Sequence, residues 1–366
     1  MADIAQDIPI AAQAPPARTT GVLGWLRANL FNGVFNSILT LLCLALLAFA
    51  IPPVIRWALI DAIWSAPSGQ QCHGAGACWA FIAEKARFIL FGFFPAGETW
   101  RPATVVGIFL VMILIACNRR SWGRRLAVVW VVGLLAVFAL MRGGALGLTP
   151  VETAMWSGLP LTLILAVVAM LLGFPLGVLL ALGRRSRLPA VRAICIGYIE
   201  LVRGVPLITV LFMASLMLPL FLPSGMTVDK LIRAQVAFIL FAGAYLAEVV
   251  RGGLQAIPKG QTEAADTLGL SYWQRTRLIV LPQALTMVIP PLVNTFIGMF
   301  KDTSLVLIIS LFDLLSCAET ALTDANWPGF YIEAYVFVGL IYWSFCFFMS
   351  RYSQVLEREF NRGKRR

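Results

Sequence analysis

The chain has 366 residues, of which 60% are hydrophobic and only 13% are charged, with a formal net charge of +11. A mean hydropathy of +0.84 excludes an ordinary soluble domain, because such a chain would leave too much apolar surface in water. The composition therefore predicts an all-α membrane protein with several spans. The positive charge lies in short loops beside apolar runs, where it sets orientation in the membrane, so we expect the lipid bilayer as a partner and no nucleic acid.

The chain begins with a polar tail, residues 1–34, which is rich in Ala and Pro and is predicted to be disordered through about Thr20. The first apolar run, residues 35–55, is long enough to span a bilayer. It lacks an Ala-x-Ala cleavage site, so we expect it to remain as a span.

The segment 56–103 combines a loop bounded by cysteines with an apolar stretch that carries charges. Cys72 and Cys78 flank His73, and these three residues are too few ligands for a metal site. The sequence is compatible both with a disulfide between the two cysteines and with two free thiols. The stretch 79–95 has three charged residues at its centre, which would be costly at mid-bilayer. We therefore expect an interfacial helix there and not a further span.

Eight runs are apolar enough to span the membrane, and prolines within them predict kinks. The expected spans are 35–55, 104–118, 125–142, 158–182, 195–222, 232–250, 284–304 and 332–350. Carbonyls freed at Pro175, Pro206 and Pro290-Pro291 would need partners, and broken helices of this kind often line substrate cavities. The alternative is a bent, well-packed bundle.

The distribution of cations gives the expected orientation. With the N-terminus inside, the inner connections carry 20 Lys and Arg residues and the outer connections carry 7. This bias places both termini in the cytoplasm. A ninth span would put the strongly basic segment 119–125 outside, which is a second argument against it.

The polar stretch 248–282 stands between long apolar runs and has the pattern of a helix–glycine–helix elbow. Thr262 is a suitable N-cap for the first helix, and Gly269 would end it. Ser271 and Gln274 have the spacing of a capping box for the second helix. A docking surface and an ordinary solvated loop are equally compatible with this spacing alone.

The elbow resembles the EAA loop of importer permeases of the ATP-binding cassette (ABC) class. The matching residues are Glu263, Ala264, Ala265 and Gly269, followed by Ile279-Val280-Leu281-Pro282. In that family the loop is the cytoplasmic coupling helix that docks on the ATPase subunit, which implies an ATPase-coupling role for the first four residues.

Two flanking segments resemble the histidine/glutamine branch of this family, whose members move polar amino acids. They are residues 200–206, ELVRGVP, and residues 300–305, FKDTSL. The resemblance covers roughly residues 155–355 and implies a type I ABC-importer permease core of five helices. The N-terminal three-helix extension resembles that of the M-type subunit of general L-amino-acid permeases.

The expected organisation has four parts. They are a cytoplasmic tail (1–34), an extension with three transmembrane helices and a periplasmic loop (35–150), a permease core that contains the coupling loop 263–282 (151–356), and a basic cytoplasmic tail (357–366).

Candidate substrate-path residues are the polar groups near or within the core spans: Glu248, Lys301, Asp302 and Ser304. Such residues are rare in spans and face a cavity or one another. Within the resemblance, the segment around Lys301 lines the translocation path, and a neighbouring cation and carboxylate suit the two charged ends of an amino acid. Structural pairing is the alternative.

We find no sign of covalent chemistry. The chain lacks the Gly-rich P-loop pattern that binds nucleotide phosphates, has a single histidine, and shows no metal-ligand cluster, so neither an enzyme nor a cofactor is expected.

The resemblance implies one permease subunit of an ATP-driven, binding-protein-dependent amino-acid importer, a multi-pass protein of the bacterial inner membrane. Its partners would be a cytoplasmic ATP-binding cassette subunit, a second, non-identical permease subunit and a periplasmic amino-acid-binding protein. The alternative is a gradient-driven secondary amino-acid transporter, but the chain shows no inverted repeat and the elbow would be unexplained.

Overall fold

The computed structural model describes residues 21–74, 76–144, 147–223 and 225–362. Within these ranges the regular structure is helical, and only two isolated bridges, Ile63–Cys78 and Gly158–Asp313, have strand-like pairing, which confirms the all-α expectation. The α-helices are α1 Gly21–Asn29, α2 Val34–Ile55, α3 Trp79–Phe91, α4 Trp100–Cys117, α5 Arg124–Arg142, α6 Gly158–Arg184, α7 Pro189–Gly204, α8 Leu207–Phe212, α9 Lys230–Gln255, α10 Lys259–Thr267, α11 Tyr272–Arg275, α12 Leu281–Met287, α13 Ile289–Asp302, α14 Leu314–Ala321 and α15 Tyr331–Arg362.

Seven helical segments in the described ranges are long and apolar enough to cross a membrane, and an eighth is a bent pair. The pair, Pro189–Gly204 and Leu207–Phe221, was expected as one span over 195–222, but it bends by 104°. The break itself has a local cause: Pro206 has no backbone N–H, and Val205 before it is extended at φ −112° and ψ 135°.

Helix α3 is too short to be a further span. Its 13 residues extend about 20 Å, against a hydrocarbon core of about 30 Å. Lys85 Nζ donates to Asp324 Oδ2 at 2.5 Å, and the hydrogen bond from this ammonium lowers the pKa of the Asp324 carboxyl. The ring of Phe81 lies 6.1 Å from that of Trp327 and 5.7 Å from that of Phe330. Lys85, one of the three charged residues of α3, thus helps to dock this helix on the segment before α15.

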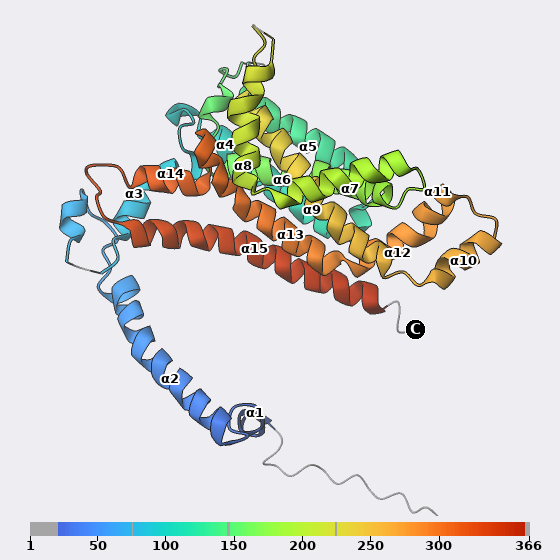
Figure 1. The fold of residues 1–366 in the computed structure, drawn as a ribbon. Helices are drawn as coiled ribbons and strands as arrows, with labels where there is room; N and C mark the ends of the chain where they lie inside the picture. The colour runs from blue at the N-terminus through green and yellow to red at the C-terminus, as the bar shows by residue number, and fades with distance from the viewer. Residues whose placement is uncertain (1–20, 75, 145–146, 224, 363–366) are drawn as a thin grey trace, which may run out of the picture. The chain divides into compact units, whose positions relative to one another are not determined.

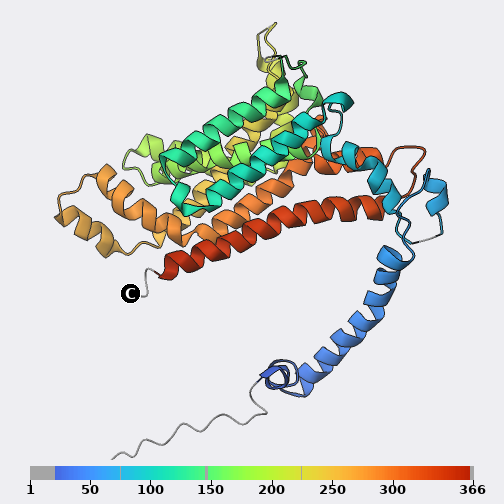
Figure 2. The same cartoon turned by 180° about the vertical axis from the view of Figure 1, so that it is seen from behind.

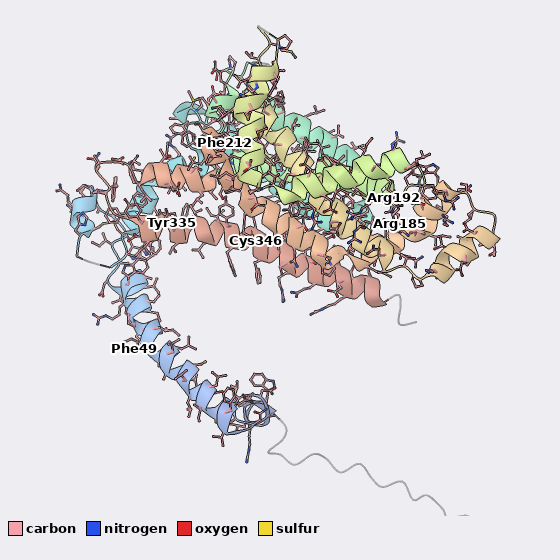
Figure 3. The ribbon with its side chains drawn as sticks, in the orientation of Figure 1. Phe49, Arg185, Arg192, Phe212, Tyr335 and Cys346 are labelled. Atoms are coloured by element: carbon pink, nitrogen blue, oxygen red, sulfur yellow. A yellow bond between two sulfur atoms is a disulfide. The ribbon has the colours of Figure 1, made fainter. Side chains whose placement is uncertain are left out.

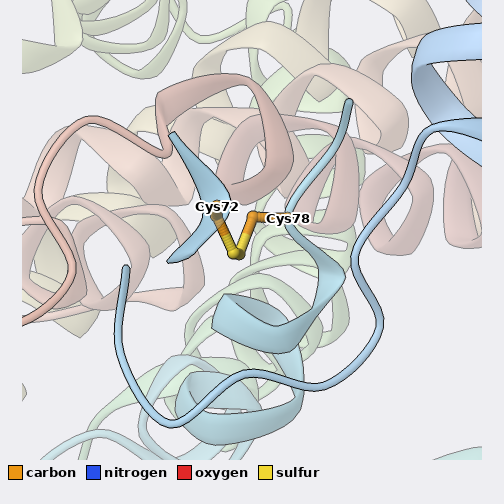
Figure 4. Close-up of a disulfide and its surroundings, with 2 residues drawn as sticks. All are labelled: Cys72 and Cys78. Atoms are coloured by element: carbon orange, nitrogen blue, oxygen red, sulfur yellow. A yellow bond between two sulfur atoms is a disulfide. The ribbon is translucent and has the colours of Figure 1, made fainter. Parts of the chain in front are cut away.

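The chain forms two compact units, and the first comprises the described residues up to Pro67 together with Gln71–Trp79. In this unit Cys72 and Cys78 form a disulfide, which selects one of the two open expectations (Figure 4). Ala77 N–H donates to Trp57 O at 2.7 Å, and the Trp79 indole N–H donates to Ala58 O at 2.8 Å. The cysteine loop is therefore joined to the end of the first span.

The second unit, Ser68–Gln70 and the chain from Ala80 onward, is a helical bundle around α6 and α9. Glycines let these two helices approach closely. A Cβ at Gly173 would lie 2.9 Å from Ala242 Cβ, and one at Gly177 would lie 2.8 Å from Leu246 Cβ. Close packing of small residues is the usual way in which membrane helices associate.

The connections of this unit are sorted to two ends of the bundle. Helices α10 and α11 lie at one end beside the C-terminal end of α15, whereas α3 and α14 lie at the other (Figures 1 and 2). At the elbow end, Arg119 pairs with Glu359 at 3.0 Å and Arg185 donates to Leu254 O at 3.1 Å. The basic connections that the sequence assigns to one side of the membrane thus come together at one end.

At the opposite end, the fully buried Arg101 of α4 holds the end of α5. Its guanidinium donates to Leu140 O at 2.7 Å, to Met141 O at 3.4 Å and to Thr149 O at 3.0 Å, and it pairs with Glu98. Hydrogen bonds from Thr149 and Arg101 lower the pKa of Glu98. A buried arginine is tolerated here because its donors are satisfied, and the C-terminal carbonyls of α5 are capped.

Candidate functional site

The elbow has the expected helix–glycine–helix form, with one error in its boundary. Gly269 adopts φ +73°, a conformation that side chains disfavour, and α10 ends two residues before it. Ser271 and Gln274 form both hydrogen bonds of a capping box at the start of α11. The expectation that Thr262 caps α10 is wrong, because the helix begins at Lys259 and its N-cap residue is Pro258, so Thr262 lies inside the first turn.

The coupling candidates Glu263, Ala264, Ala265 and Gly269 all belong to this elbow but differ in exposure. Ala265 is buried, whereas the other three are exposed. Three large apolar side chains of the same segment are also exposed: Leu268 by 77%, Trp273 by 67% and Leu278 by 64%. Large apolar side chains exposed on an otherwise polar segment are typical of a surface that contacts a partner protein or the membrane.

The two helices of the elbow are joined by an ion pair, and the α12 helix that follows them packs closely against the bundle. Arg275 of α11 pairs with Asp266 of α10, which braces the two helices against each other. Ala284 of α12 is fully buried with Val250 and Leu254 of α9 in one apolar cluster. A Cβ at Gly253 would lie 2.6 Å from Ala284 O, so α9 and α12 are in close contact. A displacement of the elbow would therefore move α9.

Glu248 is placed in a different network from the other substrate-path candidates. It pairs with Arg251 on its own helix α9, and its Oε2 lies 3.6 Å from Arg184 Nη1 of α6 and 3.6 Å from Arg203 Nη1 of α7. Arg184 also pairs with Glu200 at 2.9 Å. The arrangement of three guanidiniums around one carboxylate links three helices, as expected for structural pairing in a membrane.

Lys301, Asp302 and Ser304 lie together where α13 gives way to a 3-10 turn, Thr303–Ile309. Lys301 is exposed, Asp302 and Ser304 are half-buried, and no ion pair within 4.0 Å joins Lys301 to Asp302. The Ser304 hydroxyl donates to Lys301 O at 2.9 Å. Within the described ranges, the Asp302 carboxylate therefore forms no ion pair.

Sequence reasoning missed a buried polar cluster next to this segment. Asp313 is fully buried and accepts hydrogen bonds from Ser316 N–H at 3.0 Å and from the Tyr342 hydroxyl at 2.9 Å. The Thr162 hydroxyl accepts from Leu314 N–H at 3.1 Å. The cluster ties α6, α14 and α15 together. Its one sequence signal is Asp313 immediately before an apolar helix, an N-cap pattern.

No group of three or more His, Cys, Asp or Glu side chains that could hold a metal ion occurs in the described ranges.

Comparison with known proteins gives consistent matches. Residues 173–362 match the family described as "Binding-protein-dependent transport system inner membrane component". The inner membrane amino-acid ABC transporter permease protein YhdY of Escherichia coli (strain K12) is 51% identical, over 93% of this chain and 93% of its own length. The glutamate/glutamine/aspartate/asparagine transport system permease protein BztC of Rhodobacter capsulatus is 38% identical, over 97% of this chain and 98% of its own.

A solved structure of an amino acid ABC transporter is 31% identical over 55% of this chain and 92% of its own, with a TM-score of 0.49. The sequence matches alone decide the family, because they include relatives that align along nearly the whole chain. The chain belongs to the inner-membrane components of binding-protein-dependent transport systems, the permeases of ABC importers.

Proposed function

We propose that this permease imports polar amino acids, with energy supplied by a separate ATPase that docks on the α10–α11 elbow. A periplasmic binding protein would deliver the substrate, and a second, non-identical permease subunit would complete the path. The relatives named for amino-acid transport support the substrate class. Closure of the ATPase dimer would push the elbow, and alternating access would follow.

The observation that carries the proposal is the combination of an exposed apolar elbow and its rigid junction with the bundle. Leu268, Trp273 and Leu278 supply a surface that a partner would cover. Ala284 and Gly253 supply the close contact through which a push on the elbow would reach α9. A secondary transporter would need neither feature.

The orientation of the chain belongs to this proposal. The excess of cations at the elbow end supports a cytoplasmic elbow and cytoplasmic termini. The disulfide loop, Cys72–Cys78, would then face the periplasm, where disulfides form and persist.

Reconstitution tests the proposed function. The chain, its second permease and its ATPase would be placed in proteoliposomes with ATP inside, and the uptake of labelled glutamate or glutamine measured with the binding protein outside. We expect uptake that requires both ATP and the binding protein. Uptake driven by an ion gradient in the absence of ATP would support the secondary transporter instead.

The oxidation state of Cys72 and Cys78 tests the orientation. Membranes would be denatured in an alkylating reagent, and the peptide containing both cysteines analysed by mass spectrometry before and after reduction. We expect no alkylation of these two residues before reduction and full alkylation afterwards, because a periplasmic loop is oxidised in the cell. Full alkylation without reduction would indicate a cytoplasmic loop and reverse the topology.

A further inference from the structure

An apolar groove with a volume of about 420 Å³ lies between the α4–α5 hairpin and the core helices. It is lined by Ile113 of α4, Trp130 of α5, Leu171 of α6, Phe296 of α13 and Phe348 of α15, among other apolar side chains. These helices are all of membrane-spanning length and composition, α13 when taken together with the 3-10 turn that follows it. A groove of this kind offers hydrocarbon an apolar wall on several sides, so it suits an acyl chain.

A cluster of cations lies at the elbow end of the same hairpin, in the turn between α4 and α5. Arg119 is already engaged: it pairs with Glu359 at 3.0 Å and stands 4.3 Å from the ring centre of Phe360. Three further arginines, which we call the basic turn, are Arg120 in this turn and Arg124 and Arg125 at the start of α5. They are exposed, and no ion pair or side-chain hydrogen bond to another residue of the described ranges engages them.

The groove and the basic turn have the spacing of a lipid tail and its headgroup. Ile113 precedes Arg119 by six residues and Trp130 follows Arg124 by six. At a helical rise of 1.5 Å per residue, Trp130 lies about 9 Å along α5 from Arg124, and Ile113 lies about 6 Å along α4 from its last residue, Cys117, which precedes the basic turn. The Tyr352 hydroxyl of α15 donates to Cys117 O at 3.4 Å, which holds α15 beside α4 at this end.

We propose that this groove binds an acyl chain of an anionic phospholipid, whose phosphodiester headgroup is held by the basic turn. Three guanidiniums that form no ion pair with the described part of the chain select a negative headgroup, since each cation near a membrane surface strengthens binding to anionic lipid roughly fivefold. The apolar lining selects a lipid over a free phosphate. The site joins the N-terminal hairpin to the core helices, and it does not depend on which substrate is transported.

Native mass spectrometry of the full chain, purified with its copurifying subunits, tests whether the site prefers an anionic headgroup. The protein would be offered equal amounts of phosphatidylglycerol and phosphatidylcholine with identical acyl chains. We expect one retained phosphatidylglycerol per chain. The double variant Arg124→Gln/Arg125→Gln should weaken its retention roughly thirtyfold. The matched control is Arg187→Gln/Arg192→Gln, with Arg187 in the turn between α6 and α7 and Arg192 in the first turn of α7, at the same end of the bundle (Arg192 in Figure 3). This control should leave retention unchanged.

Large side chains introduced into the groove test whether an acyl chain occupies it. Leu171 lines the groove, whereas its neighbour Leu172 does not, and both are partly exposed, at 37% and 48%. Leu171→Trp should displace the bound lipid, and Leu172→Trp should retain it. Val167→Phe fills the same groove from the preceding turn of α6. This variant replaces Leu171→Trp in the test if Leu171→Trp does not elute as a single species in size-exclusion chromatography.

Three results would overturn the proposal. Equal retention of the two lipids by the unaltered chain would reduce the site to general lipid contact. An equal loss in the Arg187→Gln/Arg192→Gln control would mean unspecific attraction by positive charge. Full retention in both groove-filling variants would mean that no acyl chain occupies the groove.

Discussion

Replacing Gly269 by valine should abolish ATP-driven uptake while leaving the protein in the membrane. Gly269 adopts φ +73° in the turn between α10 and α11, where a side chain costs roughly 1–2 kcal/mol and β-branching adds strain. The turn would relax by moving α11, and with it the exposed Trp273. Because the elbow is exposed, the loss should fall on contact with the ATPase and not on folding.

Gly260 provides a matched control within the same elbow. It lies inside α10, has no unusual φ and has open space where a Cβ would stand. Valine at this position is tolerated by the helix, so Gly260→Val should retain uptake. ATPase activity stimulated by the loaded binding protein, and uptake, would both be measured in proteoliposomes. Normal ATPase stimulation and uptake in Gly269→Val would show that the elbow does not take part in coupling.

Charge reversal at Glu263 should act at the same contact surface. Because α10 begins at Lys259, Glu263 lies beyond the first turn, and little of the effect will come from the helix dipole. The exposed side chain instead offers a charge to the docked ATPase. We therefore expect Glu263→Lys to lower stimulated hydrolysis and uptake with little change in thermal stability, which differential scanning fluorimetry would measure.

Asp302→Asn should weaken the apparent affinity for amino acid by roughly tenfold to a hundredfold. The substitution removes the charge and nearly preserves shape. A charge-assisted hydrogen bond to a substrate ammonium contributes about 1.5–3 kcal/mol, which corresponds to that range. Asp302 is half-buried and forms no ion pair with Lys301, so it is open to such a role.

The measurement is the concentration dependence of uptake by the reconstituted complex, with Glu319→Gln as control. Glu319 is a half-buried acid on α14, outside this segment, and its neutralisation should leave the affinity unchanged. If Asp302 instead stabilises the bundle, Asp302→Asn should assemble poorly, which size-exclusion chromatography would reveal. Normal assembly with unchanged substrate dependence would reject both roles.

The local features of the fold could be predicted from the sequence because they depend on neighbouring residues. Apolar runs long enough to span predicted the membrane helices. The connections of the second unit separated into a cation-rich and a cation-poor group, which lie at its two ends. The capping box at Ser271 and the positive φ at Gly269 follow from residue types within a few positions. The short charged helix α3 could be excluded as a span for the same reason.

The partners of polar side chains were decided only by the tertiary structure. The carboxylate of Glu248 meets arginines from two other helices, 45 and 64 residues before it, and no local pattern encodes that meeting. The Asp313 cluster likewise needs Thr162 and Tyr342 from α6 and α15. The 104° bend at Val205-Pro206 also depends on packing, since a proline permits a break but does not set its angle. Periodicity along the chain determines which helices form, whereas the closest approach of distant helices determines which charges and hydroxyl groups satisfy one another.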